Sequence, residues 1–494
     1  MKDRLRVNKK NLKIIGIAVI LLALPMTLYT VYRIQNTASR AAAPDKLETE
    51  SGVLSSSGVT KQSDSNASGG QFILFNTDSS PPLESNYLAS CTTLDKDNWP
   101  SRIYPPPSIP LPGYLESVQD PTTGVKIIRI SGDPGDPIPN TNNTWSNVCG
   151  PHYPKTPAWN ADQSVLFMQN NCGVGGFLYW DAKDGPDQYN ILFARFKGNE
   201  GRWHPIYPNI MVYVEHNFKI VGFLDIYTGK AVKKYEASEN NFTKCGFGGG
   251  AGKLSDDGRY IVLMCEDSNL PKHSDTRPGM SFFVVDLISG ERASPVITSW
   301  EMPNFAWLDE VIISPSGTMI IPQESSARSV TLGFDKNDWW FMHEGTWALG
   351  HYDVGYDSQK NEIAMDGEGN TVNLKTGKKY QWLNVDYKQF HASLRNNRIP
   401  GWGIINNVRN NYFNMKPVFD GEIYAAESKP NGMIRRIIHH RSTGSTKSGS
   451  ERYVAIPFAT SSPDGTRVFF RSDWGNADGP VYAFIADIRN VCGQ

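Results

Sequence analysis

The sequence predicts an all-β protein, and three observations support this prediction. Glycine and proline account for 44 and 32 of the 494 residues, and aromatic residues make up 11%. Such a composition is typical of short strands joined by many tight turns. Charged residues make up only 20%, which argues against a coiled coil, a helical bundle or global disorder. From about residue 115 onward, one hairpin-forming unit recurs at nearly regular intervals.

Length and charge limit the classes of function. A chain of 494 residues is long for one domain, so it either divides into several pieces or forms one large repeat fold. Its 49 basic and 50 acidic side chains give a net charge of −1. No nucleic-acid partner held by a general basic surface is therefore expected.

The N-terminal segment has the features of a membrane anchor. Residues 1–13 carry six basic side chains and one acidic side chain, and the following 19 residues carry no charge. A helix of that length extends about 28 Å, which matches a bilayer core of about 30 Å. Basic residues on its N-terminal side predict a cytoplasmic N-terminus and an extracytoplasmic C-terminal domain. We therefore expect a single-pass cell-membrane protein, anchored by an uncleaved signal-anchor helix over residues 14–34.

A cleaved signal peptide is the alternative, because Ala41–Ala43 resembles a small-residue cleavage site, although the apolar run is longer than usual for a signal peptide.

Residues 35–70 contain eight serines and no aromatic residue. Such a stretch cannot bury enough apolar surface to offset the entropy of ordering. The predicted parts are a cytoplasmic basic tail (1–13), a transmembrane helix (14–34), a flexible Ser/Pro-rich stem (35–112) and a β-domain (113–494).

The recurring unit consists of an apolar stretch, a turn with Asp and Gly, and a β-rich run. Its clearest copies are Leu254–Leu263, Ile313–Ile321 and Ser462–Phe470, and Trp159–Phe167 is a weaker copy. This is the pattern of a β-hairpin, and each copy precedes a second pair of short strands. The turn centres fall near residues 162, 209, 257, 316, 359, 397 and 464.

Seven units of roughly 40–65 residues match the period of a β-propeller with four-stranded antiparallel blades. The sequence therefore predicts a seven-bladed propeller, and a tandem of β-sandwiches is the alternative. Segment 124–130 is a lone strand without a partner hairpin. In a propeller it could complete the last blade and close the ring.

All six cysteines lie on the predicted exported side, where oxidising conditions favour disulfides. Two cysteines flank the first hairpin, and two others flank the third hairpin at equivalent places, which favours pairing within each hairpin. The remaining two would join the lead-in to the C-terminus. Metal binding is the rival interpretation, but the sequence contains no Cys-x-x-Cys pair. The predicted disulfides are Cys149–Cys172, Cys245–Cys265 and Cys91–Cys492.

Four of the nine histidines lie just upstream of a hairpin turn in four different units. They are His152, His204, His351 and His391. The loop before the innermost strand of a blade lines one mouth of the ring, so we expect these side chains to gather there. Neutral imidazoles suit a transition metal or proton transfer near pH 7. The alternative is that each ring only hydrogen-bonds a neighbouring blade.

Other side chains near these positions are further candidates. The aromatic neighbours Tyr153, Trp203 and Tyr352 are predicted to bind substrate. Segment His439–Arg441 ends a strand of the sixth unit, where Arg441 could pair with a carboxylate, although an exposed edge strand is the alternative. The apolar run Trp339–Met342 is either core or a stacking platform for sugar rings.

The Ser-Pro-Asp-Gly hairpin at 462–465 and the related turns at 255–258 and 314–317 resemble those of the translocation-protein type of propeller and of the seven-bladed oligogalacturonate lyases. The resemblance covers about residues 115–490. The resemblance to the lyases implies that histidines at the propeller mouth and a divalent metal act together on uronic-acid chains. That family carries histidines just upstream of its last Asp-Gly turn, whereas residues 455–460 here contain none.

Two functions remain as hypotheses. In the first, an exported, monomeric propeller binds a glycan or another surface ligand at its mouth, and the missing last-unit histidines favour it. In the alternative, favoured by the four-unit histidine set, the chain is a metal-dependent polysaccharide lyase that cleaves uronic-acid glycans by β-elimination. His351 or His391 would then be the base, Arg441 would neutralise the uronate carboxylate, and His152 and His204 would bind metal or substrate.

Overall fold

A computed structural model of the chain describes residues 59–63, 71–75, 87–91, 94, 108–169, 172–173, 177–182, 191–195, 200–215, 218–248, 252–274, 278–302, 305, 307–382, 390–407, 419, 421–443 and 454–492. The chain divides into two compact units, which are described separately. The first comprises residues 1–80 and the second residues 81–494.

The described part of the first unit is a β-hairpin. Strand β1 (Val59–Ser63) pairs antiparallel with β2 (Gln71–Phe75). The structure differs here from the predicted flexible stem, because Phe-Ile-Leu-Phe follows the Ser-rich stretch and these residues favour strands. The predicted membrane helix at 14–34 lies outside the described residues. Among the residues that are described, no helix is long and apolar enough to cross a membrane.

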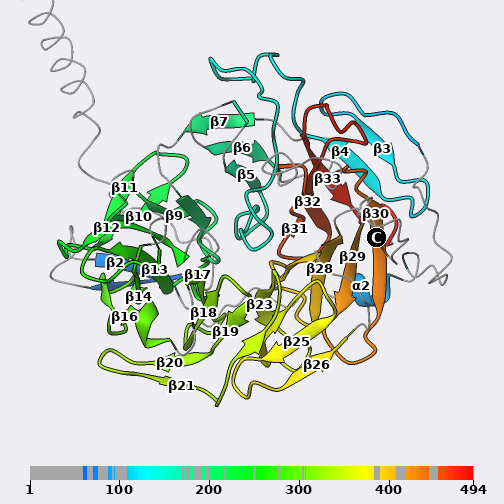
Figure 1. The fold of residues 1–494 in the computed structure, drawn as a ribbon. Helices are drawn as coiled ribbons and strands as arrows, with labels where there is room; N and C mark the ends of the chain where they lie inside the picture. Colours follow the sequence, from blue (N-terminus) through cyan, green and yellow to red (C-terminus); the bar gives the residue numbers. More distant parts are fainter. Residues whose placement is uncertain are drawn as a thin grey trace, which may run out of the picture. The chain divides into compact units, whose positions relative to one another are not determined.

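In the described part of the second unit, the strands form seven antiparallel sheets that follow one another around a centre (Figure 1). The first sheet contains β5 (Val165–Gln169), β6 (Phe177–Asp181) and β7 (Ile191–Arg195). The second contains β8 (Glu200–Trp203), β9 (Ile210–Val214), β10 (Ile220–Asp225) and β11 (Ala231–Glu236). The third contains β12 (Phe242–Phe247), β13 (Tyr260–Asp267), β14 (Met280–Asp286), β15 (Glu291–Arg292) and β16 (Ile297–Thr298).

The remaining four sheets continue this order. The fourth contains β17 (Leu308–Ile313), β18 (Met319–Glu324), β19 (Arg328–Ser329), β20 (Leu332–Phe334), β21 (Trp339–Phe341) and β22 (Trp347–Ala348). The fifth contains β23 (Asp353–Tyr356), β24 (Glu362–Met365), β25 (Asn370–Asn373) and β26 (Lys379–Gln381). The sixth contains β27 (Phe390–Ser393), β28 (Trp402–Asn407), β29 (Glu422–Glu427) and β30 (Ile434–His439). The seventh contains β31 (Thr460–Ser461), β32 (Arg467–Ser472), β33 (Tyr482–Asp487), β4 (Lys126–Arg129) and β3 (Ser117–Gln119).

This all-β architecture is that of a β-propeller, as predicted, and the two described helices are single turns, α2 (Tyr87–Ser90) and η3 (Ser299–Glu301). Four described strands are present in the second, fifth and sixth sheets, whereas the other sheets depart from the uniform four that the sequence predicts. The chain runs outward within a sheet, as Figure 1 shows for β5, β6 and β7. Because the sheets repeat one pattern, their first strands start at one end of the axis and their first hairpins turn at the other.

The seventh sheet joins the two ends of the second unit. β4 pairs antiparallel with β33, with Ile128 opposite Ile485, and β3 pairs with the outer edge of β4. The predicted ring-closing strand is thus confirmed, although it carries its own partner strand rather than being alone. Residues 117–129 therefore complete a sheet whose other three strands, β31, β32 and β33, lie more than 300 positions later in the sequence.

Six of the seven predicted turns connect the first and second strands of a sheet, and the turn near 162 lies between the isolated bridge residue Trp159 and β5. In three of them, Gly258, Gly317 and Gly465 have φ values of 72°, 75° and 72°. Only glycine adopts this backbone region without strain. Each glycine N–H donates to the carbonyl of the serine three residues earlier, at 2.8–2.9 Å. The recurring Ser-x-x-Gly signature therefore encodes one turn geometry three times.

All three predicted disulfides are present in the structure. They are Cys91–Cys492, Cys149–Cys172 and Cys245–Cys265. Leu88 and Leu94, on either side of Cys91, are buried in the core shared by the sixth and seventh sheets. The packed part of the chain therefore begins before the predicted boundary at residue 113.

Candidate functional site

Four aromatic rings from four consecutive sheets meet where the first strands of those sheets begin. Tyr153 precedes the first sheet, His351 precedes β23, His391 lies on β27, and Phe458 precedes β31. The His351 and His391 rings lie 4.3 Å apart, and Tyr153 lies 5.6 Å from His391 and 5.2 Å from Phe458. The Tyr153 hydroxyl is 3.2 Å from Nδ1 of His351. We call these four residues the mouth cluster.

The two histidines of the mouth cluster differ in their access to solvent. His351 is exposed, whereas the His391 side chain is only 3% exposed. Neither ring nitrogen of His391 has a hydrogen-bond partner in the described structure. A buried imidazole without partners loses the hydrogen bonds that water would supply, which costs about 1–3 kcal/mol. Because the unpaired nitrogens of His391 lower the stability of the fold, this ring is a candidate for contact with a ligand.

Burial and nearby cations keep the histidines of this region neutral. Although part of the His351 ring reaches solvent, protein groups packed around it displace water from its nitrogens, and this desolvation, helped by Lys155, lowers the pKa of His351 to about 4. Burial also lowers the pKa of His391, with contributions from His351, Lys155 and Arg471. The pKa of His152 falls to about 3 because of burial and because Arg202 and Arg471 lie nearby. At pH 7 the region therefore combines neutral imidazoles with permanent positive charges.

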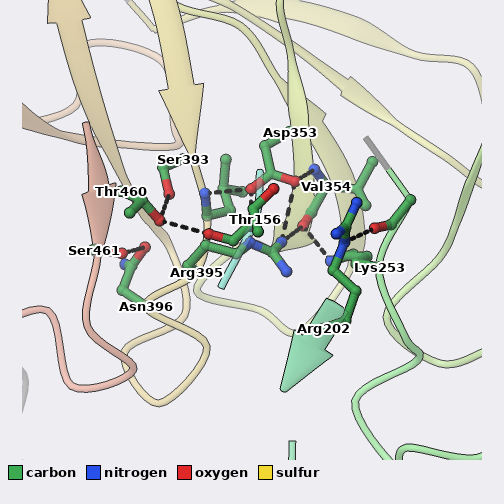
Figure 2. A network of polar contacts seen from close by, with 12 residues as sticks. Thr156, Arg202, Lys253, Asp353, Val354, Ser393, Arg395, Asn396, Thr460 and Ser461 are labelled. Carbon is green, nitrogen blue, oxygen red and sulfur yellow. Dashed lines mark hydrogen bonds and ion pairs between the residues drawn. The ribbon is translucent and has the colours of Figure 1, made fainter. Parts of the chain in front are cut away.

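The interior below the mouth cluster holds a network of buried polar groups, which we call the axial network (Figure 2). Arg395 of the sixth sheet forms two hydrogen bonds to Asp353 of β23, at 2.9 and 3.1 Å. Lys253 and Arg395 both donate to the carbonyl of Val354, each at 2.8 Å. Arg202 donates to the carbonyl of Gly252 at 2.6 Å.

A second set of contacts spans the ring. The ammonium of Lys155, next to the mouth cluster, pairs with the carboxylate of Glu310 on β17. Thr460 of the seventh sheet donates to the carbonyl of Thr156 at 3.2 Å. Side chains from non-adjacent sheets are therefore connected through the interior, which holds the first strands in fixed positions.

The structure places two predicted substrate-binding residues in the core. Trp203 is 2% exposed, packs against Phe167 and Tyr179, and donates its indole N–H to the carbonyl of Ala158 at 2.9 Å. Tyr352 is completely buried beneath Lys155. Of the three predicted aromatic residues, only Tyr153 takes part in the mouth cluster.

His204 does not join the other histidines. It follows β8 and lies in the turn before β9, where its Nδ1 accepts from the backbone N–H groups of Ile206 and Tyr207, each at 3.2 Å. Its ring lies against Gly258, in the first turn of the third sheet. His204 is thus at the turn end of the axis, whereas His152 lies before the first sheet. The structure therefore does not bring together the two predicted metal ligands.

Arg441 is also distant from the mouth cluster. It follows β30, which is separated from β27 by two intervening strands. With strands about 4.8 Å apart, β30 lies about 14 Å from the strand of His391. The Arg441 guanidinium donates to Asp120 at 3.2 Å, and both side chains are buried. The neighbouring His439 and His440 are buried as well, so the exposed edge strand is not observed.

The aromatic run on β21 is largely exposed, since Trp340 and Phe341 retain 47% and 42% of their accessible surface. Trp339 and Met342, in contrast, are half-buried and pack against the core, so the run is partly core and partly exposed surface. Sequence reasoning also missed Phe458, Lys155 and Arg471. Phe458 lies just before β31, as His351 lies just before β23, and this position was a usable signal. Arg471 lies on β32 and has no such signal. The segment of Phe458, residues 455–460, contains no histidine.

Acid is expected to destabilise the protein through His204. Burial, with a contribution from Lys234, lowers the pKa of this side chain to about 3, against about 6.5 in an unfolded chain. Between these values the unfolded state binds a proton that the folded state does not, so stability falls as pH falls from 6.5 towards 3. The slope is at most about 1.4 kcal/mol per pH unit. Denaturant midpoints measured across this range should show a flatter slope for His204→Gln than for the natural chain; an equal slope in the two proteins would contradict the assignment.

Comparisons with known proteins agree with this architecture. No protein-family model matches the sequence, and no curated protein matches it. A solved structure of oligogalacturonate lyase in complex with manganese is similar over 77% of this chain and 98% of its own, with 16% identity and a TM-score of 0.54. An oligogalacturonate lyase from Vibrio parahaemolyticus is similar over 76% and 97%, with 14% identity and a TM-score of 0.49. At such low identity, the first likeness establishes that the chain has the fold of that lyase.

Proposed function

We propose that the chain is a seven-bladed propeller that binds a glycan at the mouth cluster. The observation that carries this proposal is the meeting of Tyr153, His351 and His391, which come from three sheets and lie up to 238 positions apart in the sequence. Aromatic rings and a few oriented polar groups are typical of small-molecule sites. The unpartnered nitrogens of His391 need donors and acceptors such as sugar hydroxyls.

The charge around the mouth cluster favours an acidic glycan. Lys155 and Arg471 are close enough to lower the pKa of His391, and Arg202 has the same effect on His152. Lys155 pairs with Glu310, and the Arg202 guanidinium lies 3.8 Å from the Glu200 carboxylate. A uronate carboxylate entering this region would be attracted by the nearby cations Lys155, Arg202 and Arg471.

Binding of an oligogalacturonate to the full-length chain tests the proposal. His351→Ala should weaken binding about tenfold, because one hydrogen bond and one ring contact are lost, and this amounts to about 1.4 kcal/mol. Tyr153→Phe should cause a smaller loss, because only the hydroxyl is removed. Isothermal titration calorimetry measures both effects.

His343→Ala provides the matched control, since this histidine follows β21 near the outer edge of the fourth sheet. It should bind oligogalacturonate as the natural chain does. If His351→Ala keeps full affinity but melts at a lower temperature, the mouth cluster is a structural contact and the proposal fails.

A polysaccharide lyase is the second candidate, and the observation that favours it is His351. Its neutral, solvent-exposed imidazole is positioned by the Tyr153 hydroxyl and can accept a proton. In β-elimination, His351 would take the proton next to the uronate carboxylate. A C=C bond would form as the C–O bond to the leaving sugar breaks, and the leaving oxygen would take up a proton from water. An unsaturated product would appear as ultraviolet absorbance during the same binding experiment, and its absence together with intact binding supports a binding protein.

The donor set does not support a lyase step through a metal. Within the described ranges, no group of three or more His, Cys, Asp or Glu side chains is placed to hold a metal ion. His351 and His391 supply only two imidazoles in the mouth cluster. We therefore assign the mouth chemistry to the side chains themselves, and metal analysis of the purified chain remains a useful companion measurement.

The location follows from the N-terminal sequence. We propose that residues 14–34 anchor the chain in the cell membrane and that the propeller lies outside the cytoplasm as a monomer. The three disulfides support an oxidising compartment, because such bonds persist in exported proteins.

A further inference from the structure

An indole ring lies flat against the outer part of the fourth sheet. Trp340 is the middle residue of β21, which ends the strand order of this sheet, and it pairs directly with Gly333 of β20. A Cβ atom added to Gly333 would lie 2.5 Å from both Cε2 and Nε1 of the indole. Non-bonded carbon atoms pack best at about 3.5–4.0 Å, so the ring occupies the place where a side chain of residue 333 would stand.

The exposure of the two residues agrees with this arrangement. Gly333 is buried although it lies on an outer strand, whereas Trp340 is 47% exposed. A flat ring with one face covered and the other face open keeps about half of its surface accessible. The preceding residue, Trp339, points to the opposite face of the sheet and packs against the core. Trp340 therefore presents one face of its indole to solvent, and we call this face the Trp340 platform.

The turn beside the Trp340 platform is polar and carries negative charge. Its four residues are all exposed, and they are Asp335, Lys336, Asn337 and Asp338. Lys336 pairs with Glu291 of the third sheet at 2.8 Å, so the two aspartates give this turn a net negative charge. The carboxylate of Asp335 accepts from the backbone N–H groups of Asn337 and Asp338, at 2.7 and 2.9 Å, which fixes the turn next to the platform.

A single aromatic face beside polar groups matches the chemistry of a sugar ring. One side of a pyranose presents C–H groups that pack on an indole, and its edge carries hydroxyls that donate and accept hydrogen bonds. A protein interface or a membrane surface would instead need a contiguous apolar patch of several hundred Å². The two aspartates would repel a uronate carboxylate, so the sugar that fits is neutral. Because the platform is open, it can bind a residue inside a long polymer.

We propose that the Trp340 platform is a surface site that binds a neutral polysaccharide by stacking on one of its sugar rings. The platform is separate from the mouth cluster. Between β21 and β17, the first strand of this sheet, lie β18 and β20, so the two strands are about 14 Å apart at a spacing of about 4.8 Å. This inference does not rest on glycan binding at the mouth, and the two sites would select sugars of different charge.

Affinity electrophoresis of the full-length chain tests the proposal. Native gels that contain a soluble β-glucan, galactomannan or arabinoxylan serve as neutral probes, and a gel with polygalacturonate is the charged comparison. At least one neutral polymer should retard the natural chain. Trp340→Ala should weaken that binding about tenfold, whereas Trp340→Phe, which keeps an aromatic face, should lose less. Neither variant should change the retardation by polygalacturonate.

Gly333→Ala tests the geometry without removing the indole. Its added Cβ must push the ring off the sheet, so binding of the neutral polymer should weaken although Trp340 is present. Phe341→Ala is the matched control, because this aromatic residue of the same strand is 42% exposed but points to the opposite face. It should bind the neutral polymer as the natural chain does. The mouth variant His351→Ala should do the same, which separates this site from the mouth cluster.

Three results would overturn the proposal. The first is that no neutral polymer retards the natural chain. The second is that Trp340→Ala and Phe341→Ala give equal binding, whether weakened or unchanged. The third is a sedimentation result without polymer, in which the natural chain is a dimer and Trp340→Ala is a monomer, because the indole would then pack against a second copy. If Trp340→Ala does not fold, Trp340→Phe and Gly333→Ala give the same decision.

Discussion

Replacing Arg395 with alanine is expected to lower the free energy of unfolding by about 3–5 kcal/mol. Asp353 is completely buried and receives two hydrogen bonds from this guanidinium, at 2.9 and 3.1 Å. Its remaining donors include the backbone N–H of Leu394 at 2.7 Å. Without Arg395, a buried carboxylate would lose its cation, and the first strands of the fifth and sixth sheets would lose their main polar link. Guanidinium denaturation of the natural chain and of the Arg395→Ala variant, with urea as a check, measures the difference in the free energy of unfolding.

A salt bridge at the edge of the third sheet provides the matched control. Arg259 pairs with Asp286 at 2.8 Å, but its side chain is 44% exposed. Exposed pairs of this kind contribute about 0–1 kcal/mol, so Arg259→Ala should have little effect. Equal losses from both variants would show that burial of the Asp353 pair does not determine its contribution.

The hairpin turns and the disulfides were predictable because each depends on local chemistry repeated along the chain. Gly258, Gly317 and Gly465 all occupy a backbone region that other residues avoid, so the same short signature marks the same turn. Cys245 lies directly opposite Cys265 in the pairing of β12 with β13. A hairpin brings such positions together irrespective of the rest of the fold. Because these local patterns recur along the chain, the architecture could be predicted from the sequence.

His204 shows why the site was only partly predictable. The turn of the second sheet contains two prolines and extends from the end of β8 at 203 to the start of β9 at 210. His204, five positions before the predicted turn centre near 209, therefore lies at the end of the first strand. In the fifth and sixth sheets, His351 and His391 lie eight and six positions before the turn centres near 359 and 397, where the first strand begins. Distance from a turn locates a side chain only when the lengths of turn and strand are known.

Arg441 was misplaced for a different reason. Its partner Asp120 is 321 positions away and reaches it only because β3 and β4 complete the seventh sheet. Contacts between residues that meet only when the seventh sheet is completed depend on the whole fold, so no local sequence pattern predicts them. The same holds for Lys155 and Glu310, which are 155 positions apart and come from non-adjacent sheets.

Removing the Cys91–Cys492 disulfide by a double alanine replacement is expected to be the most destabilising change among the three cysteine pairs. The pair closes a loop with a sequence separation of 401, against 20 for Cys245–Cys265. In the chain-entropy description, such a long loop contributes about 6 kcal/mol, and a loop of about 20 residues contributes about 3 kcal/mol. The reason is that the disulfide restricts almost the entire second unit in its unfolded state. It also holds together the two ends of that unit, which must meet for β4 to pair with β33.

The matched variant replaces Cys245 and Cys265 with alanine, which removes two sulfur atoms from a buried site as well. Denaturant midpoints for the two double variants and the natural chain, each measured without reductant, should follow the order of the loop lengths. Limited proteolysis should then cut the Cys91 and Cys492 variant first near residues 87–94, because that segment is tied to the ring through the disulfide and a few core contacts. If the short-loop variant is the less stable of the two, local packing at β12 and β13 outweighs the restriction of the unfolded chain, and ring closure does not depend on the terminal link.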